Sequence, residues 1–333
     1  MLDSWKDNKS VFWTLAGPGT FWLLVFFIVP LGYLFVMSFS DKAVVNGEIS
    51  ITDYDYLTGI TNYIRSVDPL YLTIMWKSIW VSALATLLCL LTAYPIAFGI
   101  CFAPDRWKPL LLLLVILPFW INLLIRTYAL IAVFRTQGYV NNALIWIDDR
   151  TYGLINTLLA IIESIANFVV SALNYIASLW GGHIDYVQVG PLPLEMLYNN
   201  FAVIFGLVYV YMPFMVLPLY ATIERLDKSF LEASLDLGAS QFTTFRKVTV
   251  PLTMPGIVTG IILVFIPCLG SFLTPDLLGG ANAVMIGNVI ERQFKAANDW
   301  PFGAALSFML MYATFAALML RAVLAKRSAG VDV

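Results

Sequence analysis

Residues 229–251 read SFLEASLDLGASQFTTFRKVTVP and lie between two long apolar segments of the chain. Ser229 and Glu232 have the Ser-x-x-Glu spacing of a capping box at the start of a helix. Gly238 is a natural helix terminator. Ser240 can cap a second short helix, which we expect to end before the closing proline. The stretch is therefore predicted to be a polar hairpin of two short helices in a chain that is otherwise mostly apolar.

Composition places most of the chain in a membrane. Of the 333 residues, 60% are hydrophobic and 12% are charged, whereas charged residues make up about 25% of a soluble domain. The apolar residues are gathered in long runs, and about twenty of them are enough to cross a bilayer as a helix. We therefore predict an all-α polytopic membrane protein, whose first span is retained because its apolar run is too long for a signal peptide. The six predicted spans are residues 13–39, 73–102, 109–134, 200–222, 255–277 and 303–325.

Lysine and arginine residues in short connections indicate the side of the membrane that each connection occupies. They gather after the second span, in the 223–254 loop and towards both ends of the chain, whereas the connection after the first span is acidic. We therefore predict that both termini and the 223–254 loop are cytoplasmic. The basic residues that carry this prediction are Lys6, Lys9, Arg106, Lys108, Arg225, Lys228, Arg246, Lys247, Arg321, Lys326 and Arg327.

The sequence offers little material for catalysis or metal binding. The three cysteines lie in or beside apolar runs without a CxxC pair, and the one histidine, His183, has no second ligand nearby. No phosphate-binding Lys-[Ser/Thr] loop is present, so any ATP must be bound by another chain. A membrane-embedded enzyme would need a convergent acid, base or metal cluster. An ion-driven carrier would usually show intramembrane acids and an internal repeat. Both classes remain as less favoured alternatives to a transporter subunit.

Polar and aromatic residues at membrane depth are candidates for a substrate path, because polar groups there are costly and usually face a cavity or a partner. Arg126 is expected to pair with a carboxylate or to extend its head group to the outer interface. Aromatic ring faces can meet a cation, although the same residues also serve as packing or interface anchors. The candidate path residues are Trp120, Asn122, Tyr128, Tyr209, Tyr211, Asp276 and Glu291.

The polar hairpin resembles the cytoplasmic loop of ABC-importer permeases, whose pattern is Glu-Ala-Ala, three residues, Gly, nine residues and Ile-x-Leu-Pro. The matching positions are Glu232, Ala233, Ser234, Gly238, Val248, Val250 and Pro251. Ser replaces Ala, and Val replaces Ile and Leu. The resemblance implies a six-helix type I permease fold and a loop that docks into a separate ATPase subunit. The expected coupling residues are Ser229, Glu232, Ala233, Gly238, Ala239, Phe242 and Pro251.

Four further stretches look like the polyamine (spermidine/putrescine) branch of binding-protein-dependent permeases: LPFWINLLIRTY, LVYVYMPFMVLPLYATIERLD, TPDLLGG and DWPFGAALSF. This resemblance implies a bacterial inner-membrane subunit that receives substrate from an extracytoplasmic binding protein. It also implies a second, similar permease subunit and an ATPase pair that binds ATP and Mg, with no cofactor on this chain. Related permeases carry other small organic solutes, so the substrate stays open.

The resemblance fails in about 151–195. Within it, the segment 154–180 carries polar residues at near-helical spacing, which predicts an extra amphipathic helix. We place it on the extracytoplasmic side, along the membrane surface or on the outer ends of the bundle, because a seventh span would put basic connections outside. It is either a docking element for the binding protein or a neighbouring subunit, or a tolerated insertion. The polar stripe is Asn156, Glu163, Asn167, Ser171, Asn174 and Ser178.

Overall fold

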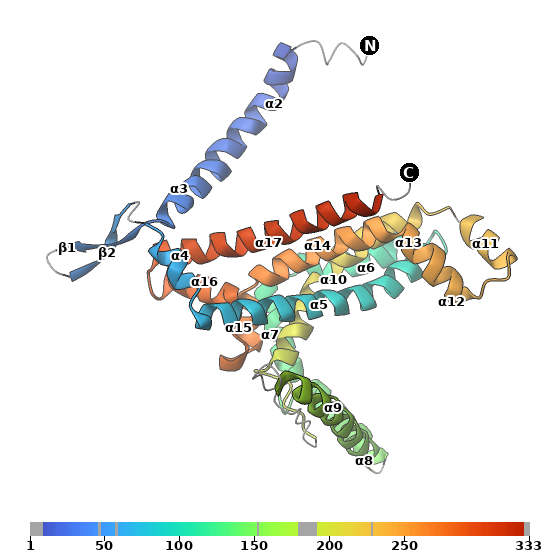
Figure 1. Cartoon of the computed structure of the whole chain (residues 1–333). Coiled ribbons are helices and arrows are strands. Elements are labelled where there is room, and N and C mark those ends of the chain that lie inside the picture. The colour runs from blue at the N-terminus through green and yellow to red at the C-terminus, as the bar shows by residue number, and fades with distance from the viewer. Residues whose placement is uncertain are drawn as a thin grey trace. The chain divides into compact units, whose positions relative to one another are not determined.

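The computed structural model describes residues 9–45, 48–56, 59–151, 153–178, 192–227 and 229–329, and these are mostly helical (Figure 1). The chain divides into two compact units. Residues Met1–Lys77 and Ile286–Val333 form the first unit, and residues Ser78–Met285 form the second. The long helix α5 (Pro69–Cys101) begins in the first unit and continues into the second.

In the first unit, the final helix α17 packs against α3, α4 and α16. Phe302 is fully buried, with the Arg65 guanidinium 3.9 Å from its ring centroid and the Tyr71 ring edge-on to it. Arg65 also forms an ion pair of 2.8 Å with Asp299. A two-stranded antiparallel sheet, which the sequence pattern did not predict, follows α3. The elements are α2 (Lys9–Leu23), η1 (Leu24–Ile28), α3 (Val29–Met37), β1 (Asp41–Val45), β2 (Glu48–Asp55), α4 (Thr61–Ser66), α16 (Ile286–Lys295) and α17 (Trp300–Ala329).

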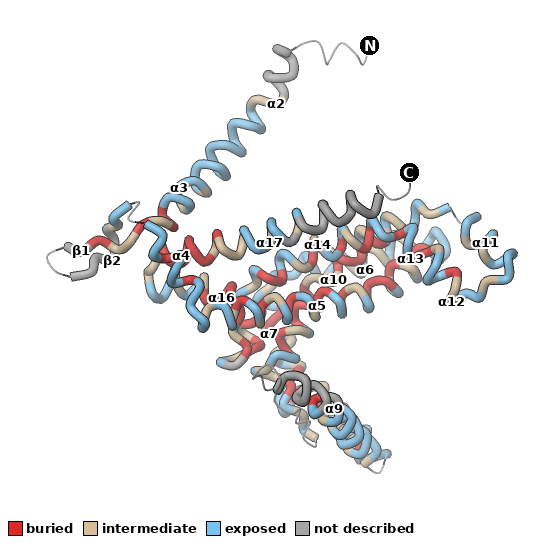
Figure 2. Tube along the Cα trace, viewed as in Figure 1, coloured by how far each residue is buried: buried red, intermediate tan, exposed pale blue. Residues whose placement is uncertain are grey.

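In the second unit, α10 and α14 form the most extensive helix pair, and buried residues follow the long helices (Figure 2). Their close approach requires glycine, because a Cβ on Gly256 would lie 2.8 Å from the Pro218 carbonyl oxygen. The elements after α5 are α6 (Lys108–Trp120), α7 (Leu123–Phe134), α8 (Tyr139–Arg150), α9 (Leu154–Ser178), α10 (Asn200–Glu224), α11 (Ser229–Asp236), α12 (Gln241–Thr244), η2 (Phe245–Thr249), α13 (Val250–Leu252), α14 (Met254–Gly270), α15 (Leu273–Leu278) and η3 (Ala281–Ala283).

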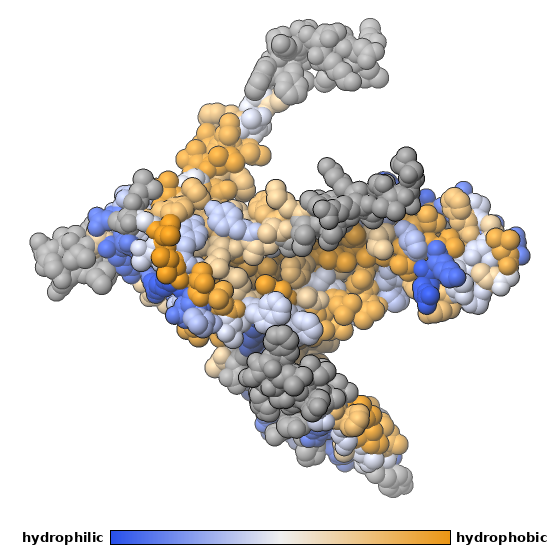
Figure 3. Space-filling view, in the orientation of Figure 1, coloured by the Kyte–Doolittle hydropathy of each residue, from blue (hydrophilic) through white to orange (hydrophobic). Residues whose placement is uncertain are grey.

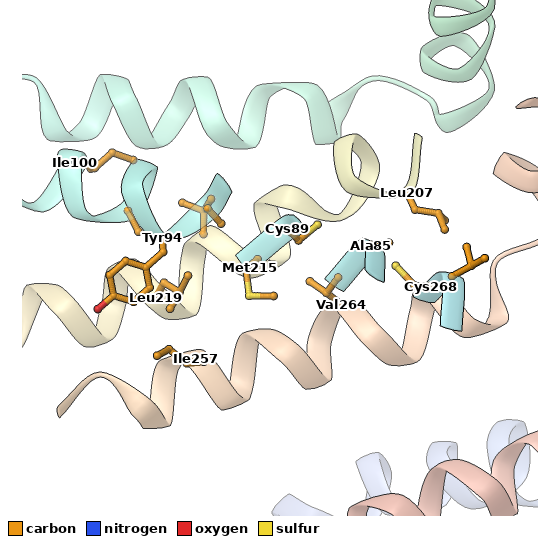
Figure 4. Close-up of a cluster of buried hydrophobic side chains, with 14 of the residues drawn as sticks. Ala85, Cys89, Tyr94, Ile100, Leu207, Met215, Leu219, Ile257, Val264 and Cys268 are labelled. Carbon is orange, nitrogen blue, oxygen red and sulfur yellow. The ribbon is translucent and has the colours of Figure 1, made fainter. Parts of the chain in front are cut away.

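The core of this unit is built on small side chains, as is usual where membrane helices pack closely. Along α5, the buried residues Ala85, Cys89, Ala93 and Ala97 recur every four positions and so share one helix face. Figure 4 shows Cys89 among larger side chains from α10 and α14. The Cys89 thiol donates to the Val208 carbonyl at 3.6 Å. The cysteines at 89, 101 and 268 are buried and form no disulfide bond, so they serve as packing residues.

Three helical stretches are long and apolar enough to cross a membrane: Ala16–Met37, Pro69–Cys101 and Asn200–Glu224. If each of two bent helix pairs is one span, the number of candidate spans among the described residues rises to five. The total of six spans remains a prediction from the sequence. The predicted span 109–134 is not one straight helix. It breaks at Ile121, which is extended, and turns through 95° where Asn122 caps the next helix. Pro118 lies in the last turn of α6 and cannot donate a backbone hydrogen bond to the preceding turn.

Candidate functional site

The polar hairpin predicted from residues 229–251 is present and lies at one end of the long helices of the second unit (Figure 1). Helix α11 ends at Gly238, which has a φ of 82°. The Ala239 N–H donates to the Ser234 carbonyl and the Gly238 N–H to the Leu235 carbonyl. These two bonds form a Schellman motif, which requires a left-handed residue at the position of Gly238. The predicted helix stop is therefore confirmed.

The sequence predicted the cap of one hairpin helix correctly but not the cap of the other. Ser240 caps α12 by accepting the Thr243 N–H at 3.2 Å, as predicted. At the start of α11, however, Asp227 accepts the Ser229 N–H at 2.9 Å, so the capping carboxylate lies two residues before the expected serine. The hydrogen bond from the Ser229 backbone, with a second from its hydroxyl, lowers the pKa of the Asp227 carboxyl.

The second hairpin helix is also longer than expected. It continues from α12 through a π-helical turn (η2) into α13, which contains Pro251. The chain then breaks at Thr253 and turns through 67° into α14. Pro251 therefore sits inside the last turn of the hairpin rather than after it.

Side-chain contacts hold the hairpin together and fix it to the ends of α5 and α14. The Ser234 and Thr244 hydroxyls are hydrogen-bonded at 2.9 Å, which joins α11 to α12. The Phe245 ring packs edge-on against Tyr94 of α5, with ring centroids 5.3 Å apart. The Tyr94 hydroxyl is in turn hydrogen-bonded to Thr253 at 2.9 Å in a buried position. These contacts therefore attach the hairpin to two long helices.

The hairpin has a hollow inner side and an apolar outer side. The hollow has a volume of about 490 Å³ and lies between the hairpin and α5. On the outside, Phe230, Leu237 and Phe242 are 54%, 89% and 71% exposed. These exposed apolar side chains are candidates for contact with a partner protein. The hollow is lined by Phe98, Phe102, Leu231, Glu232, Leu235, Gln241, Thr244, Phe245 and Thr249.

Three of the candidate path residues lie around the break between α6 and α7. Trp120 ends α6 and is 74% exposed. The Asn122 side chain accepts the Leu124 N–H at 2.8 Å and is therefore the cap of α7. Tyr128 on α7 is 57% exposed.

The remaining path candidates lie on α10, α15 and α16. Tyr209 lines a hollow of about 280 Å³ beside α5 and α6. Tyr211, two residues along the same helix, donates instead to the Pro267 carbonyl of α14 at 3.2 Å. Asp276 is exposed in the first turn of α15. Glu291 lies on α16 in the first unit and forms an ion pair with Lys295 at 2.9 Å.

Comparison with known proteins identifies the chain at the family level. Residues 10–329 match the model of the binding-protein-dependent transport system inner membrane component. The chain belongs to this family. It is 39% identical over 310 residues to the spermidine/putrescine transport system permease protein PotB of Salmonella typhimurium strain LT2, covering 93% of this chain and 91% of that protein. PotB of Escherichia coli strain K12 is 39% identical over 285 residues, covering 84% and 89%.

A solved structure shows the same fold. The crystal structure of a bacterial ABC transporter involved in the import of the acidic polysaccharide alginate contains a chain that matches with a TM-score of 0.63 at 17% identity. The match covers 98% of this chain and 99% of that chain. The expected ABC-importer permease fold is therefore confirmed, and the protein is a transport subunit of the inner membrane rather than an enzyme.

The sequence left two arrangements open for Arg126 of the permease, an ion pair with a carboxylate or a head group at the outer interface. Its side chain is only 7% exposed, and its Nε and Nη1 atoms have no hydrogen-bond partner among the described residues. No ion pair to a carboxylate is formed within those residues either. A buried cation without a partner is costly. Arg126 is therefore a buried charge in α7 that has no carboxylate partner among the described residues.

Several residues that position the permease hairpin were not predicted from the sequence. Tyr94, Thr244 and Phe245 do so through contacts between segments that are far apart in the chain, and no local pattern indicates such contacts. Asp227 could have been found, because Asp is a preferred helix cap. Within the described ranges, no group of three or more His, Cys, Asp or Glu side chains comes together in a way that could hold a metal ion.

Proposed function

We propose that this permease is one membrane-spanning subunit of an ATP-driven importer that moves polyamines of the putrescine/spermidine class into the cytoplasm. The observation that carries the substrate class is the 39% identity to a spermidine/putrescine permease across 93% of the chain. Permeases of one family transport different solutes, so another small organic solute is the alternative substrate.

The α11–α12 hairpin is the element that docks into a separate ATPase subunit. Its exposed outer side chains provide the contact surface, and its internal bonds make it rigid enough to transmit motion. ATP and Mg bind to that partner, and this chain binds no cofactor. The docking set consists of Ser229, Glu232, Ala233, Gly238, Ala239, Phe242 and Pro251.

The substrate path is a weak conduit rather than a tight binding site. Helices α5, α6, α7 and α14 contain no Asp or Glu, so they offer no carboxylate to hold a polycation. Ring faces and carbonyl oxygens attract cations less strongly, which allows a substrate to leave as well as enter. The proposed path residues are Trp120, Asn122, Tyr128, Tyr209, Tyr211, Asp276 and Glu291, and selectivity rests with an extracytoplasmic binding protein.

The proposed assembly contains this permease, a second and different permease subunit, two ATPase subunits and the binding protein. Both termini and the hairpin are placed in the cytoplasm, because the connections on that side carry the basic residues. The support for the binding protein is the family to which the chain belongs. A further relative in fold, the alginate transporter, was crystallised in complex with a periplasmic protein bound to an alginate pentasaccharide.

Uptake of labelled putrescine and spermidine tests this function. Cells lacking only this gene should lose polyamine uptake, and the restored gene should recover it, while uptake of an unrelated amino acid stays unchanged. Tagged permease should also co-purify with an ATPase and a second permease. Equal polyamine uptake with and without the gene would exclude polyamines as the substrate. Co-purification with an ATPase and a second permease would still support the assignment as an importer subunit.

A further inference from the structure

Helices α8 and α9 form a helical hairpin at the side of the second unit (Figure 1). Asp148, near the end of α8, is 7% exposed. Its Oδ1 atom accepts the N–H groups of Ile155 and Asn156 at 2.8 and 3.2 Å, and its Oδ2 atom accepts from the Asn156 side-chain amide. This carboxylate caps α9 and fixes the turn between the two helices. Asp148 therefore links the described residues of α8 and α9.

Several polar side chains of the hairpin face inwards. Asn156 accepts the Leu192 N–H at 3.0 Å, which ties the returning chain to α9. Asn141 of α8 accepts the Leu194 N–H at 2.8 Å and donates to the Leu194 carbonyl at 2.9 Å. Glu163 and Asn167 are half-buried on the same side of α9. The polar stripe predicted from the sequence thus packs partly against protein, while the side chains of Asn174 and Ser178 lie outside the described residues.

The outward face of α9 is apolar. Its large side chains are between 48% and 75% exposed and recur at intervals of three or four residues. Figure 3 shows a hydrophobic patch near the free end of the hairpin, with hydrophilic residues beside it. The exposed described residues from 154 to 171 include no charged side chain. Such a row does not remain uncovered in water. The row consists of Leu158, Ile161, Ile162, Ile165 and Phe168.

The hydroxyl groups on this face bond to their own helix. Thr157 donates to the Gly153 carbonyl at 3.0 Å, Ser164 to the Ala160 carbonyl at 2.9 Å, and Ser171 to the Phe168 carbonyl at 2.8 Å. Hydrocarbon offers no hydrogen-bond partner, so polar groups inserted into it must be satisfied internally. The face therefore presents no polar group that needs a protein partner.

Helix α8 adds side chains typical of the membrane interface. Trp146 is 56% exposed, and the Arg150 guanidinium lies 4.0 Å from the centroid of a Trp146 ring. Tryptophan is enriched at the level of lipid head groups, and arginine reaches phosphates there while its stem stays apolar. The pair belongs at the boundary between lipid and water.

We propose that the α8–α9 hairpin is an interfacial anchor whose α9 face inserts into the lipid leaflet on the side of the membrane away from the α11–α12 hairpin. Lipid fits better than a protein partner, because the face carries only aliphatic and aromatic groups and self-satisfied hydroxyls. The hairpin lies in the interface plane, as amphipathic helices with one wide apolar face do.

A fluorescent probe on a single introduced cysteine tests this placement in the assembled transporter, reconstituted in phospholipid nanodiscs. Ile165→Cys places an NBD group on the apolar face, and Asp149→Cys places it on the polar end of α8 as the matched control. The native cysteines are buried, and protein without an introduced cysteine gives the background. We expect lipids with doxyl-labelled chains to quench the probe at 165 several-fold more than the probe at 149, and aqueous iodide to show the reverse order.

The other outcomes overturn the anchor. Quenching by iodide at position 165 would place the face in water. Protection from both quenchers would place it against another subunit. Protection that appears only after the binding protein is added would make the face a docking site for that protein.

Discussion

Gly238 shows how much of the hairpin depends on one backbone angle. A Cβ at this position would meet nothing within 4 Å, so space does not require glycine, whereas its φ of 82° does. A residue with a branched Cβ costs roughly 1–2 kcal/mol in this left-handed region, and asparagine adopts it more readily. The demand at Gly238 is therefore conformational.

We expect Gly238→Asn to keep most transport and Gly238→Val to lose it, with both variants inserted in the membrane. The valine should raise hydrogen exchange across 229–236, because the two bonds that close α11 are lost. Uptake and hydrogen exchange measure the two effects. Equal activity of the two variants would show that the glycine angle does not matter for docking.

Arg126 is a residue whose removal should stabilise the permease. Its guanidinium is 7% exposed and lacks a carboxylate partner in the described part of the chain. We expect Arg126→Met to raise the stability of the purified subunit by about 1 kcal/mol or more, because an uncompensated buried charge is replaced by an apolar group of similar length. Thermal unfolding in detergent measures this, with Arg135→Met at an exposed position as the control. A lower Tm for Arg126→Met would mean that the guanidinium has a partner.

At the scale of the element, the proposed docking face of the α11–α12 hairpin differs from the face that attaches the hairpin to α5. Phe242 is 71% exposed on the outer side, whereas Phe245 packs on Tyr94. We expect Phe242→Ala to abolish stimulation of the ATPase with little change in Tm. Phe245→Ala should lower stability by about 2 kcal/mol, since it removes a packed ring. ATPase assays and thermal unfolding of the two matched variants separate the roles, and unchanged stimulation in Phe242→Ala would move the docking surface elsewhere.

Features that depend on residues close together in the sequence could be predicted from the sequence. The stop at Gly238 and the cap at Ser240 depend on bonds across a few positions, and the apolar spans depend on length and composition. The direction of the α9 faces depends instead on Asp148 and on a chain that returns at Leu192 and Leu194. A polar stripe shows that a helix has two faces, but it does not show which of them meets protein.

The candidate path is less predictable than the hairpin. Tyr209 and Tyr211 were grouped because they are close in sequence, yet two positions on a helix point in nearly opposite directions. Tyr209 faces a hollow beside α5 and α6, while Tyr211 bonds to α14. A path through a permease is lined by several helices and a partner subunit. The sequence of one chain can therefore suggest which residues line the path, but it cannot show how they are arranged in space.

At the scale of the whole molecule, the distribution of acidic residues determines where a polycation can be attracted. Helices α5, α6, α7 and α14 contain no carboxylate. Asp276 is an exposed acid in the first turn of α15, which follows the short break after α14. If the importer carries polyamines, this carboxylate should attract a trivalent substrate more than a divalent one. Near the surface, one added charge at about 4 Å is worth roughly 1–4 kcal/mol.

We therefore expect Asp276→Asn to reduce spermidine uptake several-fold more than putrescine uptake. The effect should shrink as salt is raised, because mobile ions screen exposed charges. Asp149→Asn, which removes an exposed acid from α8, is the matched control and should leave the ratio of the two uptake rates unchanged. Competition between the two labelled polyamines in the same cells measures that ratio directly. A ratio that is the same in Asp276→Asn and in the unaltered permease would remove this carboxylate from the substrate path.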